Sequence, residues 1–223
     1  MDADKSRRSS VESVPIIFPG EQEVIAFDEG CTVPRHDGRQ SINTEKWILG
    51  RYLRALAAAG SLMYPFTVIP AEQSMSPDFI LLMPGGRRIG LELTEASTPE
   101  AHRLFIESER SEGKAISCDD GVVGDAPARE WAANVCERVR VKAAKLASGH
   151  WTPADSHVLV IYENAPTSVP VNLPKTLSYL RLILAPNSGF SNVSIIADSA
   201  LKLISLMSNT RTLQIPPKGK SRG

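Results

Sequence analysis

The sequence predicts an α/β fold in which helices cover both faces of a mixed central β-sheet. Two long segments have helical periodicity, residues 42–60 and 128–148. Between them, three short apolar segments separated by turn residues indicate a meander of strands within residues 64–96. Two nearly continuous apolar strands follow at 155–166 and 191–198, as expected where both faces of a sheet are covered. The predicted core order is therefore αβββαβ.

Residues 1–40 are expected to form an N-terminal extension that is partly disordered, because its beginning is polar and lacks apolar periodicity. Within it, PIIFPG (15–20) and EVIAFDEG (23–30) predict short extended pieces bounded by glycine. The main domain is expected to span residues 41–213. A loop insertion is predicted at 97–128, with one short helix near its start.

The first long helix has Asn43 or Thr44 as its expected cap and Gly60 as its stop. A third helix is predicted at residues 173–186, with a proline in its first turn. Residues 199–207 fit either a strand or a helix. The last residues, 214–223, are basic, have no apolar period and predict a disordered tail.

The composition of the chain limits the kinds of binding site and cellular location that are expected. The chain has 223 residues with 25 basic and 25 acidic side chains, so binding to nucleic acid would depend on local patches and not on bulk charge. Its three cysteines show no CxxC spacing, which argues against a zinc site or a disulfide framework and favours a cytoplasmic location. No signal segment and no apolar run of about 18 residues is present, so no membrane association is expected. The four histidines show no ligand spacing.

The hairpin at residues 76–97 (SPDFILLMPGGRRIGLELTEAS) carries the strongest functional signal. Strand alternation puts Glu92 and Thr94 on one face and Leu93 on the other. A turn at PGG brings Asp78, at the start of the first strand, near the end of the second. Two carboxylates this close repel each other unless a cation joins them. Carboxylates together with a main-chain carbonyl such as that of Leu93 are hard oxygen ligands that suit magnesium.

Both long helices carry a charged residue on an otherwise apolar face. Lys142 lies in the middle of the stripe formed by Trp131, Val135, Val139 and Leu146, and Lys145 lies at its edge. Glu45 lies on the apolar stripe of the first helix. A lysine on a buried face must either snorkel to water or meet an anion. A metal-bound carboxylate cluster beside Lys142 would give the charged residue of each helix, Glu45 and Lys142, a partner of opposite charge.

Pro77-Asp78, thirteen intervening residues, and Glu92-Leu93-Thr94 resemble the PD-(D/E)XK nuclease superfamily, whose fold is restriction-endonuclease-like. Thr94 stands where that superfamily usually has its lysine. The resemblance implies a variant whose lysine, Lys142, has moved to the following helix, with Glu45 as the first-helix acid. The implied activity is hydrolysis of nucleic acid, DNA in preference to RNA, with Mg2+ or Mn2+ as cofactor.

The resemblance also implies roles for single residues. Asp78 and Glu92 would hold the metal together with Glu45 and the Leu93 carbonyl. Catalytic roles would fall to Lys142 or Lys145, with Thr94 as a hydrogen-bonding group. The basic residues expected to contact nucleic acid are Arg138, Lys142 and Lys145.

Two other classes of protein, and plainer roles for single residues, remain open. A nuclease-like module without catalysis would serve only in binding or assembly, and an unrelated α/β protein would make the hairpin acids coincidental. Asp78 could also be a plain turn residue, and Lys142 could snorkel. A homodimer fits the superfamily, but no feature of the sequence decides the oligomeric state.

Overall fold

A computed structural model describes residues 14–31, 41–71, 77–96, 126–163, 180, 188–197, 202–205 and 211–214. These residues form an eight-stranded sheet in which strands that follow one another in the chain lie side by side. The two pairs β4–β5 and β5–β6 are parallel, whereas the remaining neighbours are antiparallel. The prediction of a mixed sheet in an α/β fold is therefore confirmed. None of the helices in the described ranges is long and apolar enough to cross a membrane.

The elements have the following bounds. The strands are β1 (Ile16–Phe18), β2 (Phe66–Pro70), β3 (Phe79–Leu82), β4 (Arg88–Glu95), β5 (Ser156–Glu163), β6 (Asn192–Ala197), β7 (Lys202–Ser205) and β8 (Arg211–Gln214). The helices are α1 (Glu21–Gly30), α2 (Ser41–Ala58) and α4 (Ala126–Ala147), and a short 3-10 turn, η1 (Pro84–Gly86), joins β3 to β4.

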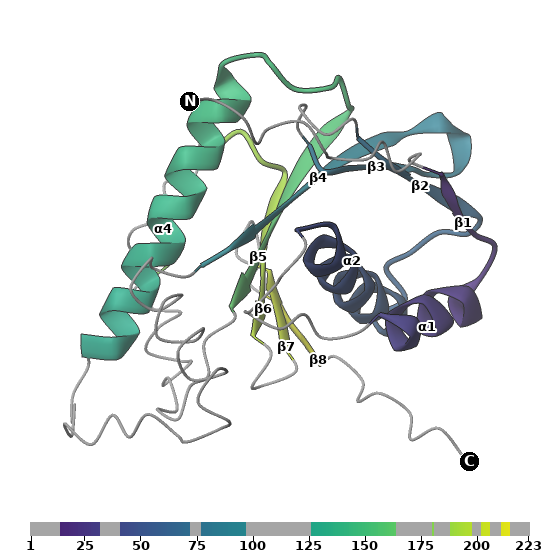
Figure 1. Ribbon diagram of the computed structural model, residues 1–223, viewed down its shortest axis with the longest axis horizontal. Helices are drawn as coiled ribbons and strands as arrows, with labels where there is room; N and C mark the ends of the chain where they lie inside the picture. The colour runs from purple at the N-terminus through teal and green to yellow at the C-terminus, as the bar shows by residue number, and fades with distance from the viewer. Residues whose placement is uncertain are drawn as a thin grey trace, which may run out of the picture.

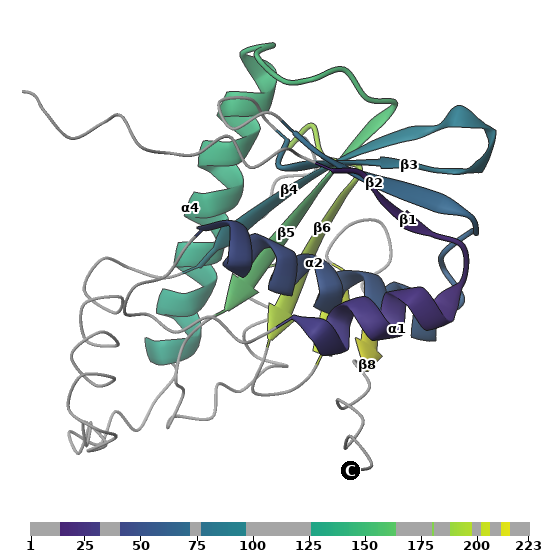
Figure 2. The same cartoon turned by 45° about the vertical axis from the view of Figure 1, so that its right-hand side comes forward.

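Helices lie on both faces of a strongly curved sheet. Helices α1 and α2 occupy the concave side, and α4 lies on the opposite face (Figure 1). Helix α2 packs against β4, β6, β7 and β8, and α1 packs along α2 (Figure 2). Two hydrophobic cores result, one around α2 and one between α4 and strands β5 and β6. Strand β5 contributes alternate residues to the two cores, which explains its nearly continuous apolar sequence.

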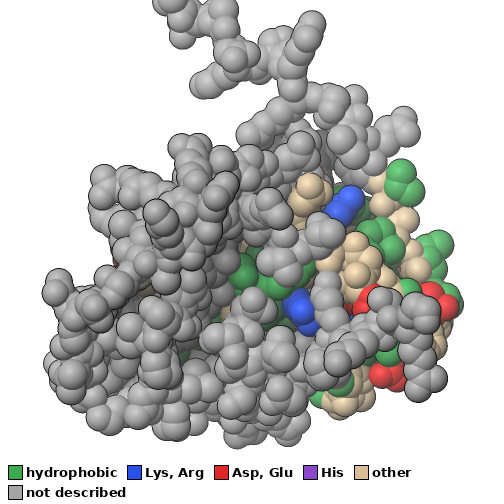
Figure 3. Space-filling model, turned by 60° about the horizontal axis from the view of Figure 1, so that its bottom comes forward, with side chains coloured by type: hydrophobic (Ala, Val, Ile, Leu, Met, Phe, Trp, Pro, Cys, Tyr) green, Lys and Arg blue, Asp and Glu red, His purple; other side chains and the backbone are tan. Residues whose placement is uncertain are grey.

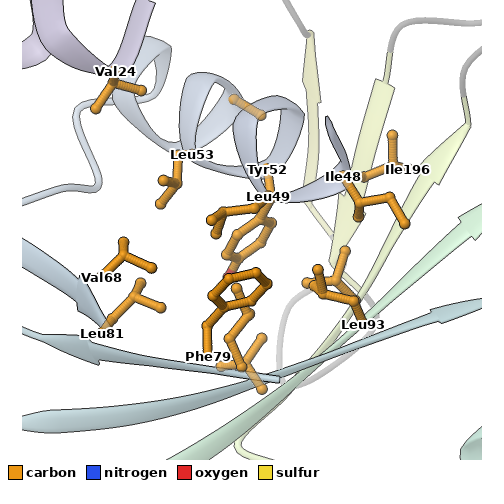
Figure 4. Close-up of a cluster of buried hydrophobic side chains, with 14 of the residues drawn as sticks. Val24, Ile48, Leu49, Tyr52, Leu53, Val68, Phe79, Leu81, Leu93 and Ile196 are labelled. Atoms are coloured by element: carbon orange, nitrogen blue, oxygen red, sulfur yellow. The ribbon is translucent and has the colours of Figure 1, made fainter. Parts of the chain in front are cut away.

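The core on the concave side rests on one stripe of α2. Leu49 and Leu53 are fully buried and Tyr52 nearly so, as the helical spacing of these residues predicts. Their side chains point toward Phe79 and Leu81 of strand β3 (Figure 4). Gly60, which was expected to stop the helix, lies just beyond the end of α2 with a φ of +61°. Backbone hydrogen bonds close the last turn of the helix at this glycine. This packing holds α2 against the sheet, where it also contacts β4.

The prediction that residues 23–30 are extended was wrong, since they belong to helix α1. The buried side chains Val24 and Asp28 are four residues apart, which is a helical spacing. Asp28 is fully buried and accepts a hydrogen bond from Arg54 of α2 at 3.1 Å. Gly50 makes this close approach of the helices feasible, because a Cβ there would lie 3.1 Å from the Asp28 Cα. Part of the N-terminal extension is therefore built into the fold.

Several element boundaries differ from those predicted. Helix α2 begins at Ser41, so Asn43 and Thr44 lie inside it and do not cap it. The segment that fitted either a strand or a helix forms strand β7. Strand β8 extends to Gln214, which the sequence assigned to the tail. Of the predicted third helix only Leu180, which is helical and buried, lies within the described residues, and most of the 97–128 insertion lies outside them.

Candidate functional site

The sheet opens between β3 and β4 at one end. Their pairing runs from Leu82 opposite Arg88 to Phe79 opposite Leu91. Strand β4 continues to pair with β5 as far as Glu95. The last residues of β4 therefore have a strand on one side only, and their other side faces the segment that leads into β3.

Asp78 lies at this opening, directly before β3. Its carboxylate Oδ2 accepts a hydrogen bond from the backbone N–H of Leu93 at 2.7 Å. Its carbonyl accepts a second hydrogen bond, from the N–H of Ala71 at 2.9 Å. In a strand, the N–H and C=O of one residue point to the same side. The Leu93 carbonyl therefore faces the same opening as the Asp78 carboxylate.

Glu92 points to the α4 side of the sheet, because Leu91 and Leu93 on either side of it fill the core around α2. Its side chain is only 1% exposed. One oxygen, Oε1, accepts a hydrogen bond from Lys142 Nζ at 2.5 Å. The other oxygen, Oε2, is buried and has no hydrogen-bond partner among the residues that the structure describes. A buried carboxylate oxygen without a donor is costly, so it indicates a position where a cation or a further donor would be accommodated.

Lys142 reaches Glu92 from helix α4. Val135 and Val139 of the same helix are buried against the sheet, and Lys142 lies on their face one turn further along. Its side chain is 21% exposed. Of the two fates open to a lysine on an apolar stripe, Lys142 therefore meets an anion. The side chain of Trp131, which was assigned to this stripe, lies outside the described residues.

Electrostatics place Glu45 in the same group of charges. Burial raises the pKa of Glu45 first of all, and the charge of Glu92 raises it further, whereas Lys142 lowers it. The pKa of Asp78 is raised to about 7, mainly by burial and then by the charges of Glu92 and Glu45, while the Leu93 hydrogen bond and Lys142 lower it. Acids from α2, from the segment before β3 and from β4 thus act on one another and on a lysine from α4.

The remaining predicted residues lie around this group. Thr94 is half-buried and shares the face of Glu92. Arg138 is half-buried, and Lys145 is exposed, one turn before and one turn after Lys142 on α4. Within the described part of the chain, no three acidic, histidine or cysteine side chains stand close enough together to hold a metal ion as they are placed. The backbone carbonyl of Leu93 is a donor beyond those side chains.

Sequence reasoning missed one feature beside the site, the packing of His157 over Gly90. The two residues face each other in β5 and β4. A Cβ on Gly90 would lie 2.6 Å from His157 Cδ2 and 2.9 Å from Pro77 Cγ, so the histidine ring and the proline both pack over the glycine. The available signal was the glycine itself, since a glycine inside a strand often marks a close approach.

Charged side chains are scattered on the face drawn in Figure 3, where the described basic and acidic groups lie among apolar and polar ones.

Comparison of the chain with protein-family models, with curated proteins and with solved structures finds no match. The site's own geometry and chemistry are therefore the basis for assigning a function.

Proposed function

We propose that this chain is a metal-dependent nuclease that hydrolyses phosphodiester bonds of nucleic acid, with DNA the more favoured substrate. One observation carries the proposal. Asp78, Glu92 and Glu45 come from three separate segments of the chain. The charge of Glu92 raises the pKa of both Asp78 and Glu45, and Lys142, which donates a hydrogen bond to Glu92, lowers both. A structural ion pair needs one acid for one lysine. Three acids beside one lysine leave negative charge that a divalent cation would neutralise.

The donor set suits Mg2+ or Mn2+. Asp78 and Glu92 would hold the cation, with the Leu93 carbonyl as a main-chain ligand and Glu45 completing the shell directly or through water. All of these donors are hard oxygens, which magnesium prefers. Glu92 Oε2 is buried and has no hydrogen-bond partner within the described ranges, so the cation would gain a ligand there without breaking the bond from Lys142. When bound, the cation supplies Lewis-acid polarisation of a phosphoryl oxygen and lowers the pKa of coordinated water.

The protein's own groups would do the rest. Lys142, held on Glu92, would place its positive charge beside the reacting phosphate and stabilise the additional negative charge of the transition state. Asp78 is oriented in advance by the Leu93 N–H, so little reorganisation would be needed when substrate binds. Thr94 would donate a hydrogen bond to the attacking water or to the phosphate, but it carries no positive charge.

Helix α4 would supply the contacts to the nucleic-acid backbone. Residues 129–145 contain five bases and two acids, which is a local excess of three positive charges in a chain with no net charge. Arg140 is paired with Glu137 at 2.7 Å, so its charge is partly compensated. Arg138 and Lys145 flank Lys142 along one side of the helix and would contact phosphates on either side of the cleaved bond.

Cleavage of plasmid and single-stranded DNA in Mg2+ or Mn2+, with EDTA as the negative control, tests the proposal. Asp78→Ala and Glu92→Ala should each abolish cleavage. Lys142→Ala should reduce the rate by about 100-fold or more, the usual effect of removing one group that stabilises transition-state charge. Lys145→Ala is the matched control on the same helix, and it should weaken DNA binding only modestly. Cleavage that survives Asp78→Ala or Glu92→Ala would exclude this assignment.

One observation favours the alternative of a nuclease-like binding or assembly module. The direct bond between Lys142 and Glu92 resembles a structural ion pair that stabilises the contact of α4 with the sheet. In that case the wild-type protein would bind DNA without cleaving it in any divalent cation, and Asp78→Ala would leave binding unchanged.

A further inference from the structure

The segment that carries Asp78 rests on a seat formed by His157 and Gly90. Asp78 directly follows Pro77, which is buried. The position of a Cβ on Gly90 would be shared by Pro77 Cγ at 2.9 Å and by two ring atoms of His157, Cδ2 at 2.6 Å and Nε2 at 3.2 Å. The absence of a side chain at Gly90 therefore leaves the space that the histidine ring and the proline both approach.

The histidine ring also packs against an aromatic side chain. Trp151 packs edge-on against His157, with ring centroids 5.3 Å apart. Trp151 in turn contacts Phe190, at 5.7 Å between ring centroids, so the stack continues into the core under α4. In the described part of the chain, the buried His157 Nε2 has no hydrogen-bond partner. The contacts that the described residues make with the ring are therefore packing contacts.

We infer that His157 is a positioning residue, which acts through Pro77 to fix the carboxylate of Asp78 in the opening between β3 and β4. The hydrogen bond from Leu93 N–H to Asp78 Oδ2 holds the carboxylate on one side. The seat formed by His157 and Gly90 would limit the movement of Pro77, and so of the backbone that carries Asp78. This role deepens the proposed function and rests on it, because the placement of Asp78 matters for catalysis only if Asp78 is a metal ligand.

The experiment compares His157→Ala with the wild-type protein in two measurements. The first is amide hydrogen exchange of Leu93 by NMR, with the core amide of Val160 as an internal reference. Loss of the seat should speed Leu93 exchange by about 10-fold, since local opening should become easier there while Val160 stays protected. The second is Mg2+ binding by titration calorimetry. The Kd should rise by about 10-fold, as found when groups that orient metal ligands are removed.

Three further variants separate shape from chemistry. His157→Phe keeps a flat ring on Gly90 and should restore both values to within about 3-fold of wild type. Gly90→Ala should disturb Leu93 exchange on its own, because its methyl group has no space. In Gly90→Ala combined with His157→Ala the methyl group occupies the vacated space, so the double variant should be less affected than the two single effects predict. His150→Ala is the matched control, since His150 is exposed and should change neither value.

Leu93 exchange in His157→Ala that matches His150→Ala would overturn the inference, and so would additive effects of the Gly90 and His157 changes. If His157→Ala also exposes Val160, the protein is opening globally, and Gly90→Ala then decides: unchanged Leu93 exchange in that variant refutes the seat. A wild-type protein that binds no Mg2+ would instead contradict the proposed function. The exchange measurement needs no metal, so the two failures are distinguishable.

Discussion

Asp78→Asn should stabilise the metal-free protein at neutral and alkaline pH. The pKa of Asp78 is raised from 3.8 to about 7, mainly by burial and then by the charge of Glu92. Between these two pH values the folded state holds a proton that the unfolded state has lost. Unfolding therefore releases a proton, and the free energy of unfolding falls as pH rises through this window. Asparagine removes the ionisation, while its amide oxygen can still accept the Leu93 N–H.

The size of the effect follows from the same two values. At about 1.4 kcal/mol for each pH unit, the interval from 3.8 to about 7 corresponds to at most about 4 kcal/mol. The free energy of unfolding of Asp78→Asn minus that of wild type should therefore grow by about 2–4 kcal/mol between pH 4 and pH 8. Urea denaturation at several pH values in EDTA measures this difference. Repetition in Mg2+ should raise the stability of the wild-type protein more than that of the variant.

Asp155→Asn is the matched control. Asp155 accepts a backbone N–H of the same strand, that of Arg88, over the same distance of 2.7 Å, but it is exposed. We expect it to lack the stabilisation, because its carboxylate remains in contact with water. Parallel pH profiles for Asp78→Asn and wild type would refute the reasoning, since they would mean that the Asp78 carboxylate is not held in a buried, acidic environment.

Two further variants test the packing around the site by urea denaturation. Lys142→Met leaves Glu92 buried without its cation and should cost about 3–5 kcal/mol of unfolding free energy, most of it recovered when Glu92→Gln is added; a cost below about 1 kcal/mol would mean that the pair is not desolvated. Gly50→Ala should destabilise by about 1–3 kcal/mol despite alanine's higher helix propensity, because its methyl group meets the Asp28 backbone at 3.1 Å. A stabilised Gly50→Ala protein would show that α1 and α2 can move apart freely.

Periodicity in the sequence was sufficient to predict most of the core. Helix α2 and strands β2 to β5 were predictable because each shows an apolar period long enough to be read locally. Helix α1 was not, since its ten residues have only two buried positions, and a segment with so few fits a strand as well as a helix. Its helical form depends on Asp28 meeting Arg54 and on Gly50 admitting it, and these are contacts between distant residues. Strand β8 also depends on a partner, β7, that the sequence left ambiguous.

The site was predictable to the extent that alternation and helical spacing fix direction. Alternation placed Glu92 and Thr94 on one face, and helical spacing placed Lys142 on the face of α4 that meets the sheet. What the sequence did not contain was the register of β3 against β4, which decides that Asp78 reaches Leu93. The seat formed by His157 and Gly90 was hidden for the same reason, because it depends on which residue of β5 lies opposite Gly90.

The balance of charge bears on whether the site is catalytic or structural. With all groups ionised, Asp78, Glu92 and Glu45 carry three negative charges and Lys142 carries one positive charge, which leaves two negative charges in a largely buried place. Such a charge is costly unless something neutralises it. Protons can do so, and the pKa values of Asp78 and Glu45 are raised accordingly, first by burial and then by the charge of Glu92. One divalent cation carries the same compensating charge and leaves every carboxylate ionised. An ion pair that served stability alone would gain from having fewer acids, so the surplus of acids favours a cation-binding role for this group.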